Sequence, residues 1–152
     1  MFFPADATGA VGLEVEQVST ESQSSIPVAV SGEKILIVDD EQSVRMVMEQ
    51  SLCHLGYEVS VANGASEALS FFGADGSGYS LVILDMIMPE VPGDQLFYQL
   101  KEIKNDVSVL IASGFSNEQK VNDMISSGAK GIIRKPFSIE ELASRVRSCL
   151  DT

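Results

Sequence analysis

Short apolar runs alternate with longer amphipathic stretches from residue 33 to the end of the chain, and this alternation constrains the fold more than any other feature. Apolar runs of this length predict strands that are buried on both faces, and helical patterns between them are typical of βαβ units in a parallel sheet. The five predicted strands are Lys34 to Val38, Glu58 to Ala62, Leu81 to Leu84, Val107 to Ile111, and Gly131 to Arg134. We therefore expect an α/β fold of five strand–helix pairs.

The first interval between strands predicts a helix that ends at Gly56. Its expected core face consists of Val44, Val47, Met48, Leu52 and Leu55. The next two helices are expected from Gly64 to Phe72 and from Gly93 to Lys104, with Phe71 and Phe72 on the core side of the former.

The last two helices have sequence signals for their first turns. Ser116 to Gln119 and Ser138 to Glu141 both fit the capping box, in which a hydroxyl and an acidic or amide side chain bond the first backbone amides. No internal repeat is evident at solenoid periods. Right-handed crossovers would then place helices on both faces of an open sheet.

Composition favours one domain with a short extra segment. The chain has 152 residues and 45% hydrophobic content, enough for one core. Residues 1–32 are small, polar and acidic without Lys or Arg, which is typical of a linker, so the domain is expected to span 33–152. The net charge of −12 disfavours nucleic acid and anionic membranes as partners.

Nothing in the sequence indicates export, membrane contact or a metal-binding cysteine cluster. The chain lacks a run of 18 apolar residues, and Met1 to Pro4 lacks the features of a signal peptide, so we expect a cytoplasmic location. Cys53 and Cys149 are far apart and predict neither a disulfide framework nor a zinc site. His54, the only histidine, precedes Gly56 at a helix end and is interpreted as a structural residue, not a phosphohistidine.

Polar side chains follow four of the predicted strands. Asp39 and Asp40 follow the first, Asp85 the third, Ser113 the fourth and Lys135 the fifth. Reactive groups in such folds gather at the carboxyl ends of the strands, so these side chains should converge. Three adjacent carboxylates repel one another unless a cation lies among them, and hard oxygen ligands suit Mg²⁺ or Mn²⁺.

This set of side chains has the parts that phosphoryl transfer requires. A carboxylate nucleophile needs positive charge to meet the equatorial phosphoryl oxygens, which the metal ion and Lys135 would supply. Ser113 offers a hydroxyl that can donate to one of those oxygens, and Gly114 leaves room beside it.

At these residues the chain resembles the receiver domains of two-component response regulators. The resemblance is carried by four segments in the right order, each at the end of a predicted strand. They are Ile35 to Glu41, Leu84 to Pro89 with Gly93, Ala112 to Gly114, and Lys135 to Phe137. It implies a flavodoxin-like sheet with strand order 2-1-3-4-5 and a phosphorelay function.

The resemblance also implies a role for each site residue. Asp85 corresponds to the phosphoacceptor, and Asp39, Asp40 and the backbone carbonyl of Ile87 correspond to further metal ligands. Ser113 resembles the switch hydroxyl. Lys135 resembles the family's lysine, with Pro136 after it across a bond that is often cis. The phosphoryl donor would be a histidine kinase or a histidine phosphotransfer domain, and the chain would catalyse only its own phosphorylation and dephosphorylation.

One departure from the family pattern bears on switching, and two further positions bear on the lifetime of the phosphoryl group. The position three residues before the lysine, often aromatic in the family, is Ile132, so we expect a loop and helix shift around Ser113 to Gln119 in place of an aromatic rotamer switch. Ile87 and Phe115 occupy positions that influence the approach of water to the phosphoryl group. Both are bulky and apolar, so we expect a shielded, comparatively long-lived aspartyl phosphate.

The sequence leaves three protein contexts open. Phe2 to Ala5 resembles the closing strand of a histidine-kinase ATPase domain, which favours a receiver from a hybrid sensor kinase. A stand-alone single-domain regulator is the main alternative, and a docking module that is never phosphorylated is the third. Whether the chain forms a homodimer is also open.

Overall fold

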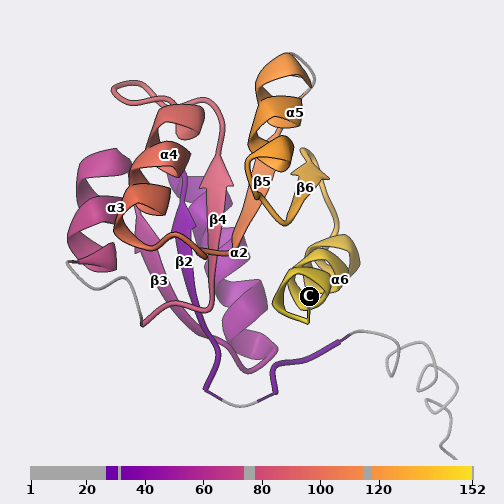
Figure 1. The fold of residues 1–152 in the computed structure, drawn as a ribbon. Coiled ribbons are helices and arrows are strands. Elements are labelled where there is room, and N and C mark those ends of the chain that lie inside the picture. Colours follow the sequence, from indigo (N-terminus) through magenta and orange to yellow (C-terminus); the bar gives the residue numbers. More distant parts are fainter. Residues whose placement is uncertain (1–26, 31, 74–77, 115–117, 152) are drawn as a thin grey trace, which may run out of the picture.

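The computed structural model describes residues 27–30, 32–73, 78–114 and 118–151, which form a parallel β-sheet between two helical layers (Figure 1). The strands lie in the order β3-β2-β4-β5-β6. Their bounds are β2 Lys34–Val38, β3 Glu58–Ala62, β4 Leu81–Asp85, β5 Val109–Ser113 and β6 Gly131–Arg134. The α/β class and the strand order 2-1-3-4-5 are confirmed.

Both faces of the sheet are covered because successive apolar side chains of a strand point to opposite sides. From β2, Leu36 and Val38 join a core beneath α3, α4 and α5, whereas Ile35 and Ile37 join a second core beneath α2 and α6. All four are fully buried. The helices are α2 Gln42–His54, α3 Ala65–Phe72, α4 Gly93–Ile103, α5 Glu118–Ser126 and α6 Ile139–Leu150.

The fourth strand was predicted two residues too early. Val107 is buried, but it precedes β5, which runs to Ser113. Ala112 and Ser113 are as buried as the aliphatic residues before them, although their side chains are small or polar. The strand therefore continues through Ala112 and Ser113, beyond the apolar run from which it was predicted.

One side chain of the predicted core face of α2 is wrongly assigned. Val47 is 55% exposed and lines a hollow of about 480 Å³ with Val44 and Phe137, whereas Ser51 lies on the buried face with Met48. The prediction chose Val47 because it is apolar and passed over Ser51 because it is polar. The buried stripe of the helix in fact runs through Ser51.

The end of α2 follows the prediction. Gly56 has φ +101°, a left-handed conformation that favours glycine. The amides of Gly56 and Tyr57 donate to the carbonyls of Cys53 and Leu52, which completes the cap. His54 is exposed in the last turn of the helix.

Two other helix predictions have mixed outcomes. Phe72 is buried in α3, but Phe71 is 45% exposed, since consecutive residues of a helix cannot share one face. Ser138 caps α6 by accepting a hydrogen bond from the amide of Glu141 at 3.0 Å, as predicted. The other capping box begins at Ser116, outside the described residues, which resume at Glu118.

A short segment before β2 is attached to the amino edge of the sheet. The amide of Ala29 donates to the carbonyl of Leu55, where α2 ends. Arg147 of α6 donates to the carbonyl of Val28 and forms an ion pair with Glu33. Helices α2 and α6 run opposite to the strands, so these contacts lie at the far edge from the strand ends that carry Asp39 and Asp85.

None of the helices in the described part of the chain combines the length and apolar character needed to span a bilayer.

Candidate functional site

The predicted site residues lie together at the carboxyl edge of the sheet. β2 and β4 are neighbours, and the chain order reverses between them, which is where open α/β sheets form their crevice. Asp39 follows β2, and Asp85 ends β4. Ser113 ends β5 and Lys135 follows β6, so the strands bring these side chains to one edge.

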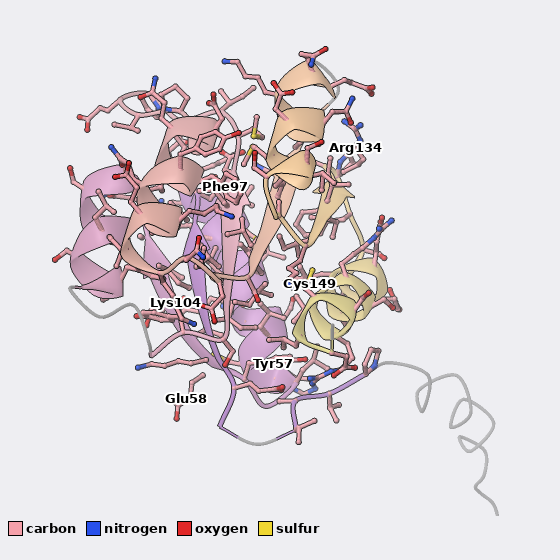
Figure 2. All side chains as sticks on the ribbon, in the orientation of Figure 1. Tyr57, Glu58, Phe97, Lys104, Arg134 and Cys149 are labelled. Atoms are coloured by element: carbon pink, nitrogen blue, oxygen red, sulfur yellow. The ribbon has the colours of Figure 1, made fainter. Side chains whose placement is uncertain are left out.

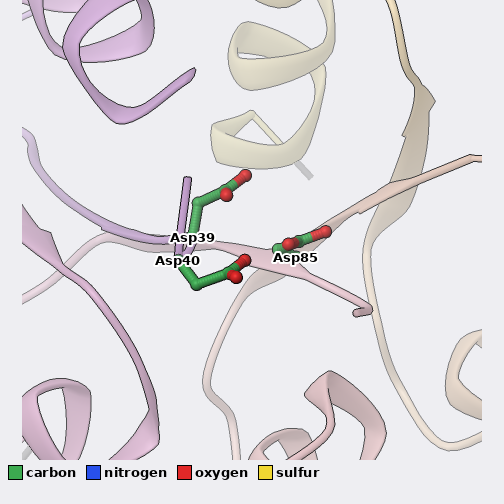
Figure 3. A group of neighbouring side chains, drawn as sticks. All are labelled: Asp39, Asp40 and Asp85. Carbon is green, nitrogen blue, oxygen red and sulfur yellow. The ribbon is translucent and has the colours of Figure 1, made fainter. Parts of the chain in front are cut away.

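Three carboxylates form a cluster at this edge (Figure 3). Asp39, Asp40 and Asp85 each offer one oxygen, and these oxygens lie within 4.8 Å of one another. Asp39 and Asp85 are buried, whereas Asp40 is exposed. Buried carboxylates as close as these are stable only with compensating positive charge.

Lys135 supplies part of that charge. Its Nζ donates to Asp39 Oδ2 at 2.9 Å and to Asp85 Oδ1 at 3.2 Å. One ammonium against three carboxylates leaves an excess of two negative charges when all four groups are ionised. Hard oxygen donors with this excess fit a divalent ion such as Mg²⁺, which is the chemistry predicted from the sequence.

Burial controls the ionisation of Asp85. It raises the pKa of Asp85 to about 6, and the charge of Asp39 adds to the increase while Lys135 opposes it. Burial also lowers the pKa of Lys135, but its hydrogen bond to Asp39 and the charges of Asp39 and Asp85 outweigh this, so the net pKa is raised. At neutral pH the pair therefore presents an ionised carboxylate beside an ammonium.

The backbone around Asp39 is held by the first turn of α2. Asp39 Oδ1 accepts a hydrogen bond from the amide of Glu41 at 2.9 Å. The Asp39 carbonyl accepts from Arg45 Nη1 at 2.8 Å. These contacts fix the carboxylate as the chain turns from β2 into α2.

The side chains that follow Asp85 alternate between the core and the surface. Met86 and Met88 are buried in the core, whereas Ile87 is 62% exposed. The amide of Ile87 lies 3.4 Å from Asp85 Oδ1. The backbone carbonyl of Ile87 as a metal ligand stays a prediction.

Ser113 is buried, and its hydroxyl donates to the carbonyl of Gly114 at 3.1 Å. The peptide bond between Lys135 and Pro136 is cis, as the resemblance implied. A cleft of about 570 Å³ opens above the carboxylates and is lined by Asp40, Glu41, Asp85, Ile87, Gly114 and Lys135. Phe115, predicted to shield this cleft, lies outside the described residues.

Two contributors to the site were not assigned individually from the sequence. Gly93 begins α4 directly against the backbone of Asp85, and the family-like spacing of a glycine after the acceptor was the available signal. Arg134 donates to the Gly114 carbonyl at 2.6 Å. A basic residue beside Lys135 has no distinctive signal in one sequence.

Comparison with known proteins agrees with this geometry. The family model for the response regulator receiver domain matches residues 35–147, so the chain belongs to this family. Receiver domains bind Mg²⁺ through an acidic pocket and interact with histidine kinases or phosphotransfer proteins in two-component signalling.

Relatives occur in different protein contexts. The chain is 39% identical over 121 residues to "Probable transcriptional regulator ycf27" of Porphyridium aerugineum, covering 78% of this chain and 48% of the relative. It is 31% identical over 117 residues to "Sensor kinase CckA" of Brucella abortus, covering 77% of this chain and 12% of the kinase. The chain thus spans about half the length of the ycf27 relatives.

Solved structures show the same fold. A response regulator receiver domain protein from Clostridium thermocellum aligns with TM-score 0.74 at 27% identity, over 78% of this chain and 94% of that structure.

Proposed function

We propose that this chain accepts a phosphoryl group on Asp85 from a phosphohistidine and changes its surface in response. The observation that carries the proposal is the pairing of Asp85 with Lys135 beside Asp39 and Asp40. This arrangement combines a carboxylate nucleophile with a cation and two further oxygen donors at one strand edge.

In the proposed transfer, a carboxylate oxygen of Asp85 bonds to phosphorus as the bond from phosphorus to the donor imidazole nitrogen breaks. The nitrogen keeps the electron pair of that bond. Asp39, Asp40, Asp85 and the Ile87 carbonyl would hold Mg²⁺, which when bound supplies Lewis-acid stabilisation of phosphoryl charge. Lys135 holds Asp85 in place before transfer and faces the added phosphoryl oxygens after it.

The function can be tested with acetyl phosphate as donor, in which a bond from phosphorus to oxygen breaks and acetate leaves. Intact-mass spectrometry should show a gain of one phosphoryl group that requires Mg²⁺. Asp85→Asn should abolish the gain, while Asp106→Asn, a change to an exposed carboxylate, should not. No gain in the unmodified chain would favour the docking module that is never phosphorylated.

For the protein context we propose a hybrid sensor kinase in which residues 1–32 are a linker and 33–152 the receiver. The match to a sensor kinase, of which the receiver is a small part, supports this context. The second candidate is a response regulator, favoured by the higher identity to ycf27. Phe2 to Ala5, which suggested a kinase domain, lies outside the described residues, and the cytoplasmic location stays a prediction.

An antibody against residues 33–152 can distinguish these contexts. On an immunoblot of the source cells, a hybrid kinase gives a band several times the mass of this domain, which should also label with a histidine-kinase ATP analogue. A smaller band that does not label would support the regulator.

A further inference from the structure

The Gly114 carbonyl accepts hydrogen bonds from two side chains of different strands. Ser113 Oγ donates to it at 3.1 Å, and Arg134 Nη1 donates to it at 2.6 Å. Ser113 and Arg134 are register partners on β5 and β6. The hydroxyl of the candidate site therefore shares an acceptor with a guanidinium outside the carboxylate cluster.

Arg134 is also bound to the first residue of α5. Its Nη2 donates to Glu118 Oε2 at 3.0 Å, and Arg134 extends from β6 beside this helix (Figure 2). The two side chains are 37% and 67% exposed, so their ion pair contributes little free energy. Its effect is to orient the planar guanidinium, whose donors have a fixed geometry, toward Gly114.

The shared acceptor matters because a hydroxyl has only one proton to donate. If Ser113 turns toward a phosphoryl oxygen, it leaves the half-buried Gly114 carbonyl, and losing the last donor to such a carbonyl is costly. Arg134 keeps a charge-assisted hydrogen bond to that oxygen when the hydroxyl leaves.

We propose that Arg134 is a positioning residue that frees the Ser113 hydroxyl to bind the phosphoryl group by keeping the Gly114 carbonyl bonded. Through Glu118 it also links this event to α5. The inference rests on the proposed phosphorylation of Asp85. The contacts of Arg134 would connect the Ser113 hydroxyl to α5. Such a connection matters here because Ile132 replaces the aromatic residue through which switching is commonly transmitted in the family.

The test measures the rate of Mg²⁺-dependent phosphorylation by acetyl phosphate, followed by intact mass. Arg134→Met should slow phosphorylation roughly three- to tenfold, since in this variant Ser113 is the last donor to the Gly114 carbonyl and must leave it without a partner as the transition state forms. Arg134→Lys should restore part of the rate because an ammonium can still donate to Gly114. Arg145→Met, which removes an exposed charge from α6, should match the unmodified chain.

A double-mutant cycle with Ser113→Ala separates positioning from a general structural effect. Without the hydroxyl, Arg134→Met should change the rate less than about twofold, because nothing needs to leave Gly114. Equal slowing in both backgrounds would show that Arg134 acts independently of Ser113 and would overturn the inference. Thermal unfolding of each variant identifies any loss of folded protein.

Glu118→Gln provides a second variant that keeps Arg134 itself. It should slow phosphorylation less than Arg134→Met does, because the guanidinium remains but is less well oriented. Should Arg134→Met not fold, rates unchanged in both Arg134→Lys and Glu118→Gln would overturn the inference. An unmodified chain that gains no phosphoryl group overturns the proposed function and this inference together, whereas normal phosphorylation of Arg134→Met overturns the inference alone.

Discussion

Gly93 packs so closely against Asp85 that a Cβ atom on Gly93 would overlap the backbone oxygen of Asp85 and lie 2.9 Å from Met86 Cα. The amide of Gly93 also donates to the Met86 carbonyl at 3.0 Å. The first residue of α4 thus fixes the backbone that carries the candidate phosphoacceptor, and only glycine fits there without a shift of that backbone.

Gly93→Ala should therefore lower both stability and phosphorylation. Overpacking against backbone atoms should cost about 1 to 3 kcal/mol of unfolding free energy, and the displaced Asp85 should react more slowly. Urea unfolding and acetyl phosphate labelling measure the two effects. Gly64→Ala is the matched control, because a Cβ there meets no heavy atom within 4 Å, and a Gly93→Ala chain as stable and reactive as this control would contradict the prediction.

Asp85 should make metal-free protein less stable as the pH rises. Its pKa is raised to about 6 in the folded state, so between pH 4 and pH 6 the folded chain holds a proton that the unfolded chain releases. Stability from this group is lost across that window and stays low above it. Asp85→Asn should remove this slope and increase unfolding free energy at pH 7.5 by about 1 to 3 kcal/mol, measured by urea unfolding with EDTA.

Added Mg²⁺ provides a control for that measurement. It should stabilise the unmodified chain more than Asp85→Asn, because ligand binding to the folded state adds stability in proportion to affinity. The explanation based on burial of Asp85 fails if both chains show the same pH slope without metal.

The ion pair of Glu33 and Arg147 should make the domain sensitive to acid. The hydrogen bond from Arg147 is the main reason that the pKa of Glu33 lies below its ordinary value, and the distance from Arg147 Nη2 to Glu33 Oε2 is 2.6 Å. A lowered pKa means that the stabilisation is present at neutral pH and is lost as the pH falls through the folded-state value.

Glu33→Gln should lower stability at pH 7 by on the order of 1 kcal/mol, since the pair is only partly buried, and should have less effect at pH 3. Chemical unfolding at both pH values tests this. Glu140→Gln, an exposed first-turn change in α6, serves as the control, and an equal loss at pH 3 and pH 7 would count against the ion pair as the cause.

The lifetime of the aspartyl phosphate should depend on Ile87. This side chain is 62% exposed and lines the cleft over Asp85, where its bulk would hinder an attacking water. Ile87→Asn should shorten the phosphoryl half-life several-fold, measured by mass spectrometry after removal of acetyl phosphate. Ile103→Asn, a partly exposed change at the end of α4, should leave it unchanged, and equal lifetimes for Ile87→Asn and the original chain would sink the shielding idea.

The sequence predicts the sheet well because strand periodicity and strand-end residues are local signals. The bounds of β2, β3 and β6 agree with the predicted ones. Asp39 and Asp85 both contact Lys135, and Ser113 ends the neighbouring strand, as the topology requires. Exposure was harder to predict for Val47 and Phe71, because the polar Ser51 takes a buried position and adjacent aromatic residues diverge around a helix.

Contacts between distant residues account for most of what the sequence did not reveal. The hydrogen bond between Arg134 and Gly114 spans 20 positions, and the ion pair between Glu33 and Arg147 spans 114. A single sequence has no spacing rule for such pairs. These contacts depend on how β6 and α6 pack against the neighbouring elements.

The attachment of Val28 and Ala29 to Arg147 and Leu55 has a mechanical consequence. A force applied to the chain through this segment would act on the receiver at the carboxyl ends of α2 and α6. The sheet lies between these ends and the carboxylates. These contacts and the carboxylates lie at opposite ends of the strands. A phosphoryl donor could therefore reach Asp85 without displacing these contacts.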